Sequence, residues 1–326
     1  EQFSNKSNNF SKVTFDVTDG TLTITPKSIV PDPENPDNTM SVDSPADVVY
    51  NGQDQTWTPV VKDGERTLEP GTDYNVAYSR TDRTNATGEI VVTITGSGNY
   101  SGEVKRTYQI TKRPVELKSE GGSKPYDGTA LVKPEVSGWQ QQGDTGFVTG
   151  EVSSVRATGS VTTVAQGEVA NSIAYDTNAG FNADNYAISK DEGALSVTAK
   201  QIAAADMAVQ APADVVYSGK AQQQKPVVKD GDKTLVEGVD YELTYSGNAT
   251  DAGTVTVTVA GKGDYAGSVD VAYQIAPAPL TVTTESANKV YDGKPLTAGG
   301  KVDGLVNGET VAFKLVGSQT RVGSSD

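Results

Sequence analysis

The sequence of 326 residues contains no cysteine and no histidine. Without cysteine no disulfide can form, and without either residue structural zinc, haem-thiolate and iron–sulfur sites lose their usual ligands. The lack of histidine excludes Ser-His-Asp and Cys-His catalytic groups and an imidazole base near neutral pH. Carboxylates are so frequent that no glycosidase pair can be picked out. The sequence therefore predicts a protein that is not an enzyme and uses no cofactor.

Positive charge and long apolar runs are also scarce. The chain has 27 Lys and Arg against 42 Asp and Glu, which gives a formal net charge of -15. This balance argues against nucleic-acid binding, which needs clustered cations. No stretch approaches the roughly 18 consecutive apolar residues of a membrane span, and the first residues lack the pattern of a signal peptide. We expect no nucleic-acid partner and no membrane span and, if the protein is exported, an internal piece of a longer one.

Internal repetition is the feature that the sequence does have. Laid on itself at an offset of about 165 residues, the chain matches itself over most of its length. A first repeat type occupies residues 40–111 and 202–276. Its recurring motifs are ADVVY at 46–50 and 213–217, PVVKDG at 59–64 and 226–231, and GTDY at 71–74 with GVDY at 238–241. These two copies predict two domains of one fold, which we call the first-type modules.

A second repeat type is complete only at 112–201, the second-type module. Its opening motif KPYDG (124–128) recurs as KVYDG (289–293), and its closing motif GALSVT (193–198) recurs as GTLTIT (20–25). We therefore expect residues 277–326 (the head segment) to be the N-terminal half of another copy, and residues 1–29 (the tail segment) to be a C-terminal half. The chain then comprises two periods of about 163 residues that start within a domain.

Residues 30–39 (VPDPENPDNT) form the clearest candidate linker. Three prolines among acidic residues favour an extended and fairly stiff connection. We therefore expect this Pro-rich linker to join the tail segment to the first complete module.

The local pattern indicates β-strands throughout. Segments such as EIVVTIT (89–95) and TVTVTV (254–259) alternate β-branched residues with a period of two. Asp-Gly pairs at 19, 63, 127, 230 and 292 predict hairpin turns, and no long window keeps a helical apolar stripe. We expect an all-β protein, an elongated tandem array of small Ig-like β-sandwich domains. A β-grasp-like fold of the second repeat type is the alternative.

Both repeat types resemble known families. On KPYDG, KVYDG and the closing motifs, the second type resembles the tyrosine-aspartate-glycine (YDG) repeats, grouped with the MBG repeats of large bacterial surface proteins. The first type resembles Ig-like surface repeats of Gram-positive bacteria, on GTDY, GVDY and the turns GSGNYSG (96–102) and GKGDYAG (261–267). The resemblance implies an extracellular protein of the bacterial cell surface. In such a cell-wall-anchored adhesin, this chain would be a structural stalk that projects a binding tip.

The alternative is that the repeats themselves bind mucin-type glycans or a host extracellular-matrix protein. Trp57 is the candidate residue, because Gln224 stands at its place in the other copy and a partly exposed indole can stack on a sugar. Tyrosines recur at matched positions of both copies, but packing within one shared fold explains them without a ligand. Lone surface aromatics usually carry no function, so the ligand stays unknown.

Two further patterns have ordinary explanations. Asp176, Asn178, Asn182 and Asp184 are spaced like the oxygen donors of a calcium loop, but the EF-hand glycine and glutamate are missing. A polar turn explains them equally, so no metal is expected beyond this weak candidate. Lys62 and Lys229 precede Asp-Gly pairs, so we expect solvated turn lysines rather than isopeptide crosslinks.

The two halves of the second repeat type raise the question of self-association. Each half alone would leave unpaired sheet edges, which recruit other strands. We expect that 277–326 of one molecule pairs head to tail with 1–29 of another.

Overall fold

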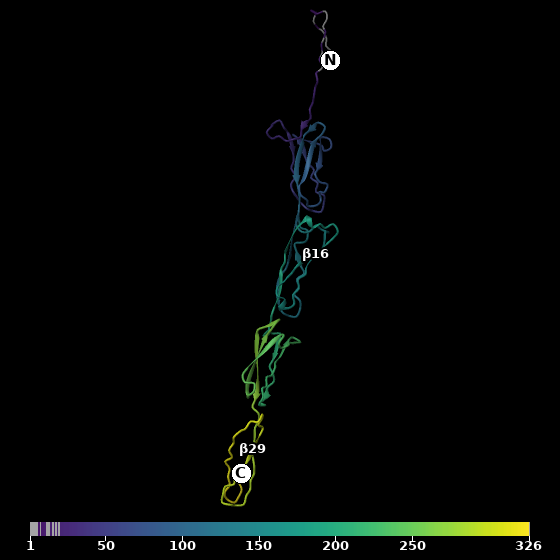
Figure 1. Ribbon diagram of the computed structural model, residues 1–326. Coiled ribbons are helices and arrows are strands. Elements are labelled where there is room, and N and C mark those ends of the chain that lie inside the picture. The colour runs from purple at the N-terminus through teal and green to yellow at the C-terminus, as the bar shows by residue number, and fades with distance from the viewer. Residues whose placement is uncertain are drawn as a thin grey trace. The chain divides into compact units, whose positions relative to one another are not determined.

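The computed structural model describes residues 6, 8–10, 14, 16, 18 and 20–325. Figure 1 draws the strands of these residues as arrows. The only helices in this part of the chain are two three-residue 3₁₀-helices, η1 (Val164–Gln166) and η2 (Ala183–Asn185). The all-β prediction is therefore confirmed. Within these same residues, no helix has the length and apolar character needed to cross a membrane.

The chain divides into two compact parts. One consists of Glu1–Leu117, Ser137–Val155 and Tyr175–Asp191, and the other of Lys118–Val136, Arg156–Ala174 and Glu192–Asp326. The division passes through the second-type module rather than beside it.

The first-type module at 40–111 is built from two three-stranded antiparallel sheets. One has the order β2 (Met40–Val42), β4 (Val61–Asp63), β5 (Arg66–Thr67), and the other β6 (Tyr74–Tyr78), β7 (Ile90–Gly96), β9 (Glu103–Tyr108). Two parallel pairs flank them, β3 (Val48–Val49) with β10 (Ile110–Thr111), and β1 (Lys27–Ser28) with β8 (Tyr100–Ser101). In β7, Ile90, Val92 and Ile94 are buried, so its alternation of side chains supplies the core.

The first-type module at 202–276 repeats this plan with longer strands. One sheet has the order β20 (Met207–Gln210), β22 (Val227–Asp230), β23 (Lys233–Thr234). The other has the order β21 (Val215–Val216), β27 (Ser268–Ala276), β25 (Gly253–Gly261), β24 (Tyr241–Ser246), and β19 (Lys200–Gln201) pairs with β26 (Tyr265–Ala266). Val228 of the first sheet and Val259 of the second are buried in one cluster. Two sheets around one core make each first-type module a small Ig-like sandwich.

The second-type module contains three small sheets. Their orders are β13 (Val136–Ser137), β11 (Arg113–Ser119), β17 (Tyr186–Asp191); β12 (Gly122–Pro125), β18 (Ala194–Thr198), β15 (Val169–Ala170); and β14 (Val152–Ala157), β16 (Ile173–Thr177). All of 112–201 is described, and it holds no α-helix. The β-grasp alternative, which needs a helix packed across the sheet, is therefore wrong.

The two half-repeats differ from the complete module. The head segment has one two-stranded sheet in its described residues, β28 (Thr281–Thr284) with β29 (Gly300–Asp303). Much of the tail segment, including Asp19 of its Asp-Gly pair, lies outside the described residues. Its last residues form β1, and Ile29 is fully buried.

Residues 30–39 are not the extended linker that proline content predicts. The segment makes successive turns, with Asn35 N–H donating to the Asp32 carbonyl and Asn38 N–H to the Asn35 carbonyl. The Asn38 amide then donates to the Val30 carbonyl at 3.0 Å, which brings the two ends of the segment together. Because these hydrogen bonds satisfy the backbone locally, this stretch is a loop that leads into β2.

The Asp-Gly prediction is correct at two places and wrong at two. Asp63 and Asp230 end the first strands of the hairpins β4–β5 and β22–β23. Asp127 and Asp292 form no tight hairpin turn, and Asp292 lies within the long loop 285–299 that joins the antiparallel strands β28 and β29. At Asp127 the preceding strand β12 pairs with β18 in parallel.

Candidate functional site

The segment around Trp57 is held by tyrosine hydroxyls. Tyr78 donates to the Trp57 carbonyl at 2.8 Å, and Tyr108 donates to the Gln55 carbonyl at 3.0 Å. The other first-type module has the same arrangement, with Tyr245 donating to the Gln224 carbonyl and Tyr273 to the Gln222 carbonyl. These tyrosines recur because they hold an irregular edge of the sandwich, which agrees with the structural explanation.

Trp57 is half-buried, as predicted, and lines an open groove of about 380 Å³. The other residues that line the groove are Tyr108, Gln55, Thr56, Ser44, Pro45, Ala46 and Val48. In the other module, Gln224 is held by the same pair of tyrosine hydroxyls, so this backbone arrangement does not require an indole. The side chain of Trp57 therefore forms a wall of the groove rather than a part of the fold.

A second candidate lies where a second-type repeat meets a first-type module. Lys200 of β19 forms an ion pair with Asp230 at 2.6 Å, and Tyr265 of β26 donates to the other oxygen of Asp230 at 3.1 Å. Burial lowers the pKa of Lys200, and its hydrogen bonds to Asp206 and Asp230 outweigh that effect and raise it. Lys200 thus stays charged and binds the module that follows it.

The same joint occurs a second time, at the end of the tail segment. Lys27 pairs with Asp63 at 2.7 Å, and Tyr100 donates to Asp63 at 3.3 Å. The hydrogen bonds from Lys27 and then from Thr39 lower the pKa of Asp63. In both joints a buried isoleucine follows two residues after the lysine, Ile29 and Ile202. We call this Lys-Asp-Tyr arrangement with its parallel strand pair the entry joint.

The YDG motif supplies the other side of the entry joint. The ring of Tyr126 packs edge-on against Tyr265 with centroids 5.5 Å apart, and Lys233 lies over both rings. Nearby, the Asp264 carboxylate accepts from the Val164 N–H at 2.7 Å. Tyr126 is therefore a packing residue of the joint.

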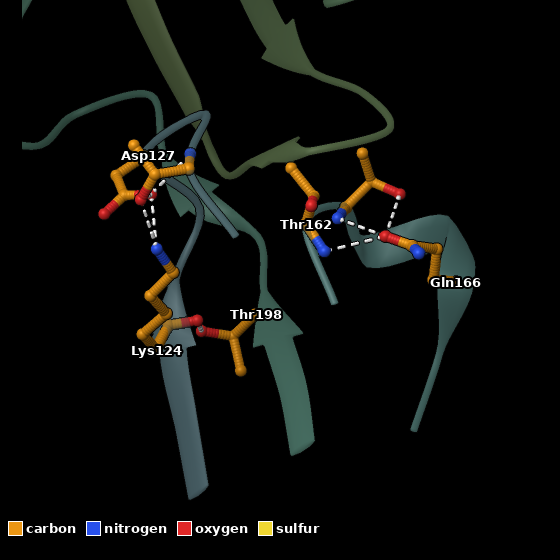
Figure 2. Close-up of polar contacts among 7 residues, drawn as sticks. Lys124, Asp127, Thr162, Gln166 and Thr198 are labelled. Atoms are coloured by element: carbon orange, nitrogen blue, oxygen red, sulfur yellow. Dashed lines mark hydrogen bonds and ion pairs between the residues drawn. The ribbon is translucent and has the colours of Figure 1, made fainter. Parts of the chain in front are cut away.

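The Asp-Gly part of the motif makes a turn with its own ion pair. Figure 2 shows Lys124 directed at Asp127, with Nζ 2.7 Å from Oδ1. Asp127 also accepts from the Thr129 N–H at 2.9 Å, and these bonds, led by that of Lys124, lower its pKa. Figure 2 also shows the Gln166 side chain, which accepts from the Thr162 N–H at 2.7 Å. Gly128 has φ +78°, which favours glycine.

A different joint links the first-type module at 40–111 to the second-type module. Glu151 accepts from Tyr50 at 2.6 Å and from Tyr186 at 2.7 Å, and the two rings meet edge-on. Burial and then the hydrogen bond to Glu151 raise the pKa of Tyr50 to about 12. Two tyrosines from different modules thus share one carboxylate.

Arg113 is the buried cation of this second joint. It is 1% exposed, and its guanidinium donates to the carbonyls of Tyr50 (3.2 Å), Gly146 (2.7 Å), Thr145 (2.8 Å) and Gly143. An arginine keeps its charge in proteins, so these carbonyls replace the water that it loses. Sequence reasoning missed Arg113, which does not recur in the other copy, and Glu151, which recurs as Glu309 in a stretch with few other matches.

The corresponding place before the head segment is altered. Ala278 replaces Arg113. The loop that surrounds the guanidinium runs from Gly138 to Gly150, whereas its counterpart before the last repeat is shorter and runs only from Gly304 to Gly308. A cavity of about 270 Å³ lined by Ala278, Tyr217 and Glu309 lies at this position. Tyr217 still donates to Glu309, so the tyrosine–glutamate bond is kept without the arginine.

The calcium candidates are engaged in local hydrogen bonds. Asp176 accepts from the Ser154 hydroxyl at 2.6 Å, the Asn178 amide donates to the Gly150 carbonyl, and Asn182 accepts from the Asp184 N–H. Among the residues that the structure describes, no group of three or more Asp and Glu could hold a metal ion. The calcium hypothesis stays a prediction, which melting with and without calcium tests. Lys62 and Lys229 are exposed on β4 and β22, as expected.

Comparisons with known proteins do not assign the chain to a family. No family model matches the sequence, and no curated protein matches it either. Among solved structures, domains 1–4 of protocadherin gamma B7 align over 70% of this chain and 74% of that one, with 9% identity and a TM-score of 0.24. Drosophila N-cadherin EC1-4 aligns over 74% and 76%, with 11% identity and a TM-score of 0.21. Likenesses of this size carry no conclusion about function.

Proposed function

We propose that the chain is a stalk region of a bacterial cell-surface adhesin, which holds a binding tip away from the cell wall. A spacer fixes the position of its tip only if neighbouring modules cannot swivel freely. The observation that carries the proposal is the entry joint, which occurs twice with the same lysine, aspartate and tyrosine. In each case a strand pair also ties the connecting segment to the next module.

The composition suits such a role outside the cell. A net charge of -15 favours solubility, and a chain without cysteine does not depend on oxidative folding. A stalk also needs no catalytic group, which fits the lack of histidine.

Spin labels across one joint test the stalk proposal. Glu168→Cys and Asp232→Cys place labels on exposed positions of the second-type module and the following first-type module, in a chain with no other cysteine. We expect one narrow distance distribution in pulsed electron paramagnetic resonance. Lys200→Ala should broaden it, because the ion pair with Asp230 is lost.

Lys225→Ala is the matched control, because Lys225 pairs with Glu237 inside one module. It should leave the distribution narrow. A wild-type distribution as broad as that of a flexible tether would refute the stalk proposal.

A second candidate function is glycan binding in the Trp57 groove. It is favoured by the aromatic walls, Trp57 and Tyr108, and by the amide and hydroxyl groups of Gln55 and Thr56. Sugars bind to such combinations of a flat aromatic face and polar groups.

The chain supplies the matched variant for this function. Trp57→Gln copies the residue of the other module, so the fold should be kept, and binding to a mucin-glycan array should be lost. Gln224→Trp should create a second site. Equal binding by wild type and Trp57→Gln, or no binding by either, would remove this candidate.

A further inference from the structure

Every complete module has a strand near its start that pairs in parallel with a strand near its end. In the two first-type modules, β3 pairs with β10 and β21 pairs with β27. In the second-type module, β12 pairs with β18 over four residues, and Figure 2 shows Thr198 of β18 beside Lys124 of β12. We call each of these three parallel pairs a terminal clamp.

The terminal clamps coincide with motifs that recur along the sequence. ADVVY (46–50 and 213–217) contains β3 and β21, and YQI (108–110 and 273–275) extends into their partner strands. GALSVT (193–198) contains β18. Much of the repetition in the chain therefore lies in the strands that join the start of a module to its end.

Side chains add to the backbone pairing of the clamp in both first-type modules. Asp47 accepts from the Gln109 N–H at 3.0 Å, and Asp214 accepts from the Gln274 N–H at 2.7 Å. Both aspartates are exposed, so they contribute nothing to the apolar core. What they have in common is a bond across the terminal clamp.

Two connections between modules pass directly from strand to strand. A single residue, Lys112, separates β10 from β11, and a single residue, Ala199, separates β18 from β19. β19 then pairs in parallel with β26 of the following module. A pull along the chain therefore reaches these modules through hydrogen-bonded strands rather than through a slack loop.

The direction of the pairing decides how a pull acts on the hydrogen bonds. The two strands of a terminal clamp point the same way, and the bonds between them are evenly spaced. A pull on both ends of the chain draws the earlier strand toward its N-terminal end and the later strand toward its C-terminal end. The strands must then slide past each other, so their bonds share the force. Strands pulled apart from one end instead break their bonds in turn, which needs less force.

We propose that the modules bear tension along the chain, and that the terminal clamps are the parts that resist it. This function goes beyond the stalk proposal, because a spacer that fixes the position of a tip need not resist a pull. The spin-label experiment on the stalk measures the spread of distances across a joint at rest. A pulling experiment measures the force that opens one module, so each proposal can fail without the other.

Optical-tweezers pulling between two introduced cysteines tests the proposal on the whole chain, which has no native cysteine. Ala203→Cys with Pro277→Cys draws β21 and β27 along each other, whereas Ser218→Cys with Pro277→Cys pulls apart the adjacent ends of the same strands. All three positions are exposed. We expect the first geometry to need at least about twofold more force at equal loading rate, because several bonds break together. Released lengths on the order of 250 Å and 200 Å identify the module.

A side-chain variant tests the clamp itself. Asp214→Ala removes its bond to the Gln274 N–H and should lower the opening force in the first geometry by roughly a fifth or more, since fewer bonds share the pull. Glu242→Ala is the matched control, because Glu242 is also exposed and its bond to Lys262, at 2.6 Å, lies away from the clamp. It should leave the force unchanged. Equal forces in the two geometries, or equal effects of the two substitutions, would overturn the proposal.

Discussion

At the scale of residues, one carboxylate often serves two modules at once. Asp230 binds Lys200 from the strand that enters the module and Tyr265 from the module itself. Glu151 likewise accepts from Tyr50 and Tyr186. Such bonds are partly shielded from water and therefore stronger than exposed ion pairs, whose contribution is small. The joints depend on these few residues more than on the many surface charges.

Arg113 is the residue whose loss should matter most. Arg113→Ala leaves the carbonyls of Tyr50, Gly143, Thr145 and Gly146 without their donor. We expect a loss of about 2–4 kcal/mol in the free energy of unfolding of the part that contains it. Urea unfolding followed by circular dichroism measures this loss.

Arg80→Ala is the control for Arg113, because Arg80 lies exposed in a loop. It should change the free energy of unfolding by less than about 0.5 kcal/mol. Equal effects of the two substitutions would show that the buried guanidinium does not hold the joint.

At the scale of elements, a strand that is hydrogen-bonded to a neighbour on each side resists local unfolding better than a strand with one neighbour. β25 pairs with β24 and with β27 over most of its nine residues, and Val255, Val257 and Val259 are buried. All four residues of β28 are exposed, and its sheet has only two strands. Two-stranded sheets are marginal in water, so the head segment should open far more readily.

Amide hydrogen exchange should show this difference. At low protein concentration, the amides of β25 should exchange on the order of 1000-fold more slowly than those of β28, because local opening of β28 breaks few contacts. Mass spectrometry of peptides from the two strands gives the rates. Equal protection of both strands in a monomeric sample would contradict the expectation.

The sequence predicts long strands well and the joints poorly. β7 and β25 follow from the alternation of β-branched residues, and the hairpins at Asp63 and Asp230 follow from Asp-Gly turns. β1 and β19 are only two residues long, and they are strands because another segment pairs with them. Local pattern cannot reveal such strands. The recurrence of Lys27 and Ile29 as Lys200 and Ile202 was the available signal for the joint.

At the scale of the whole molecule, the titrating groups set a pH range of stability. Hydrogen bonds to neighbouring side chains and backbone lower the pKa of Asp54, Asp63, Asp82, Asp127, Asp206, Glu242 and Asp292. Burial raises the pKa of Tyr74, Tyr78, Tyr186, Tyr241, Tyr245 and Tyr265. No histidine is present to titrate between them.

The sign of each contribution follows from these directions. A carboxyl whose pKa is lower in the folded chain stabilises it above the unfolded pKa, about 4, and this stabilisation is lost as the pH falls further. A tyrosine whose pKa is higher in the folded chain, such as Tyr50, stabilises the fold below about pH 10, and this stabilisation is lost as the pH rises toward 12.

We therefore expect the melting temperature, measured by calorimetry at constant salt, to be level from about pH 5.5 to 9 and to fall on both sides. Asp63→Asn should lower the plateau and reduce the acid fall, whereas the exposed-loop control Asp37→Asn should do neither. A transition between about pH 6 and 8 would contradict this account, since no histidine is present to produce it.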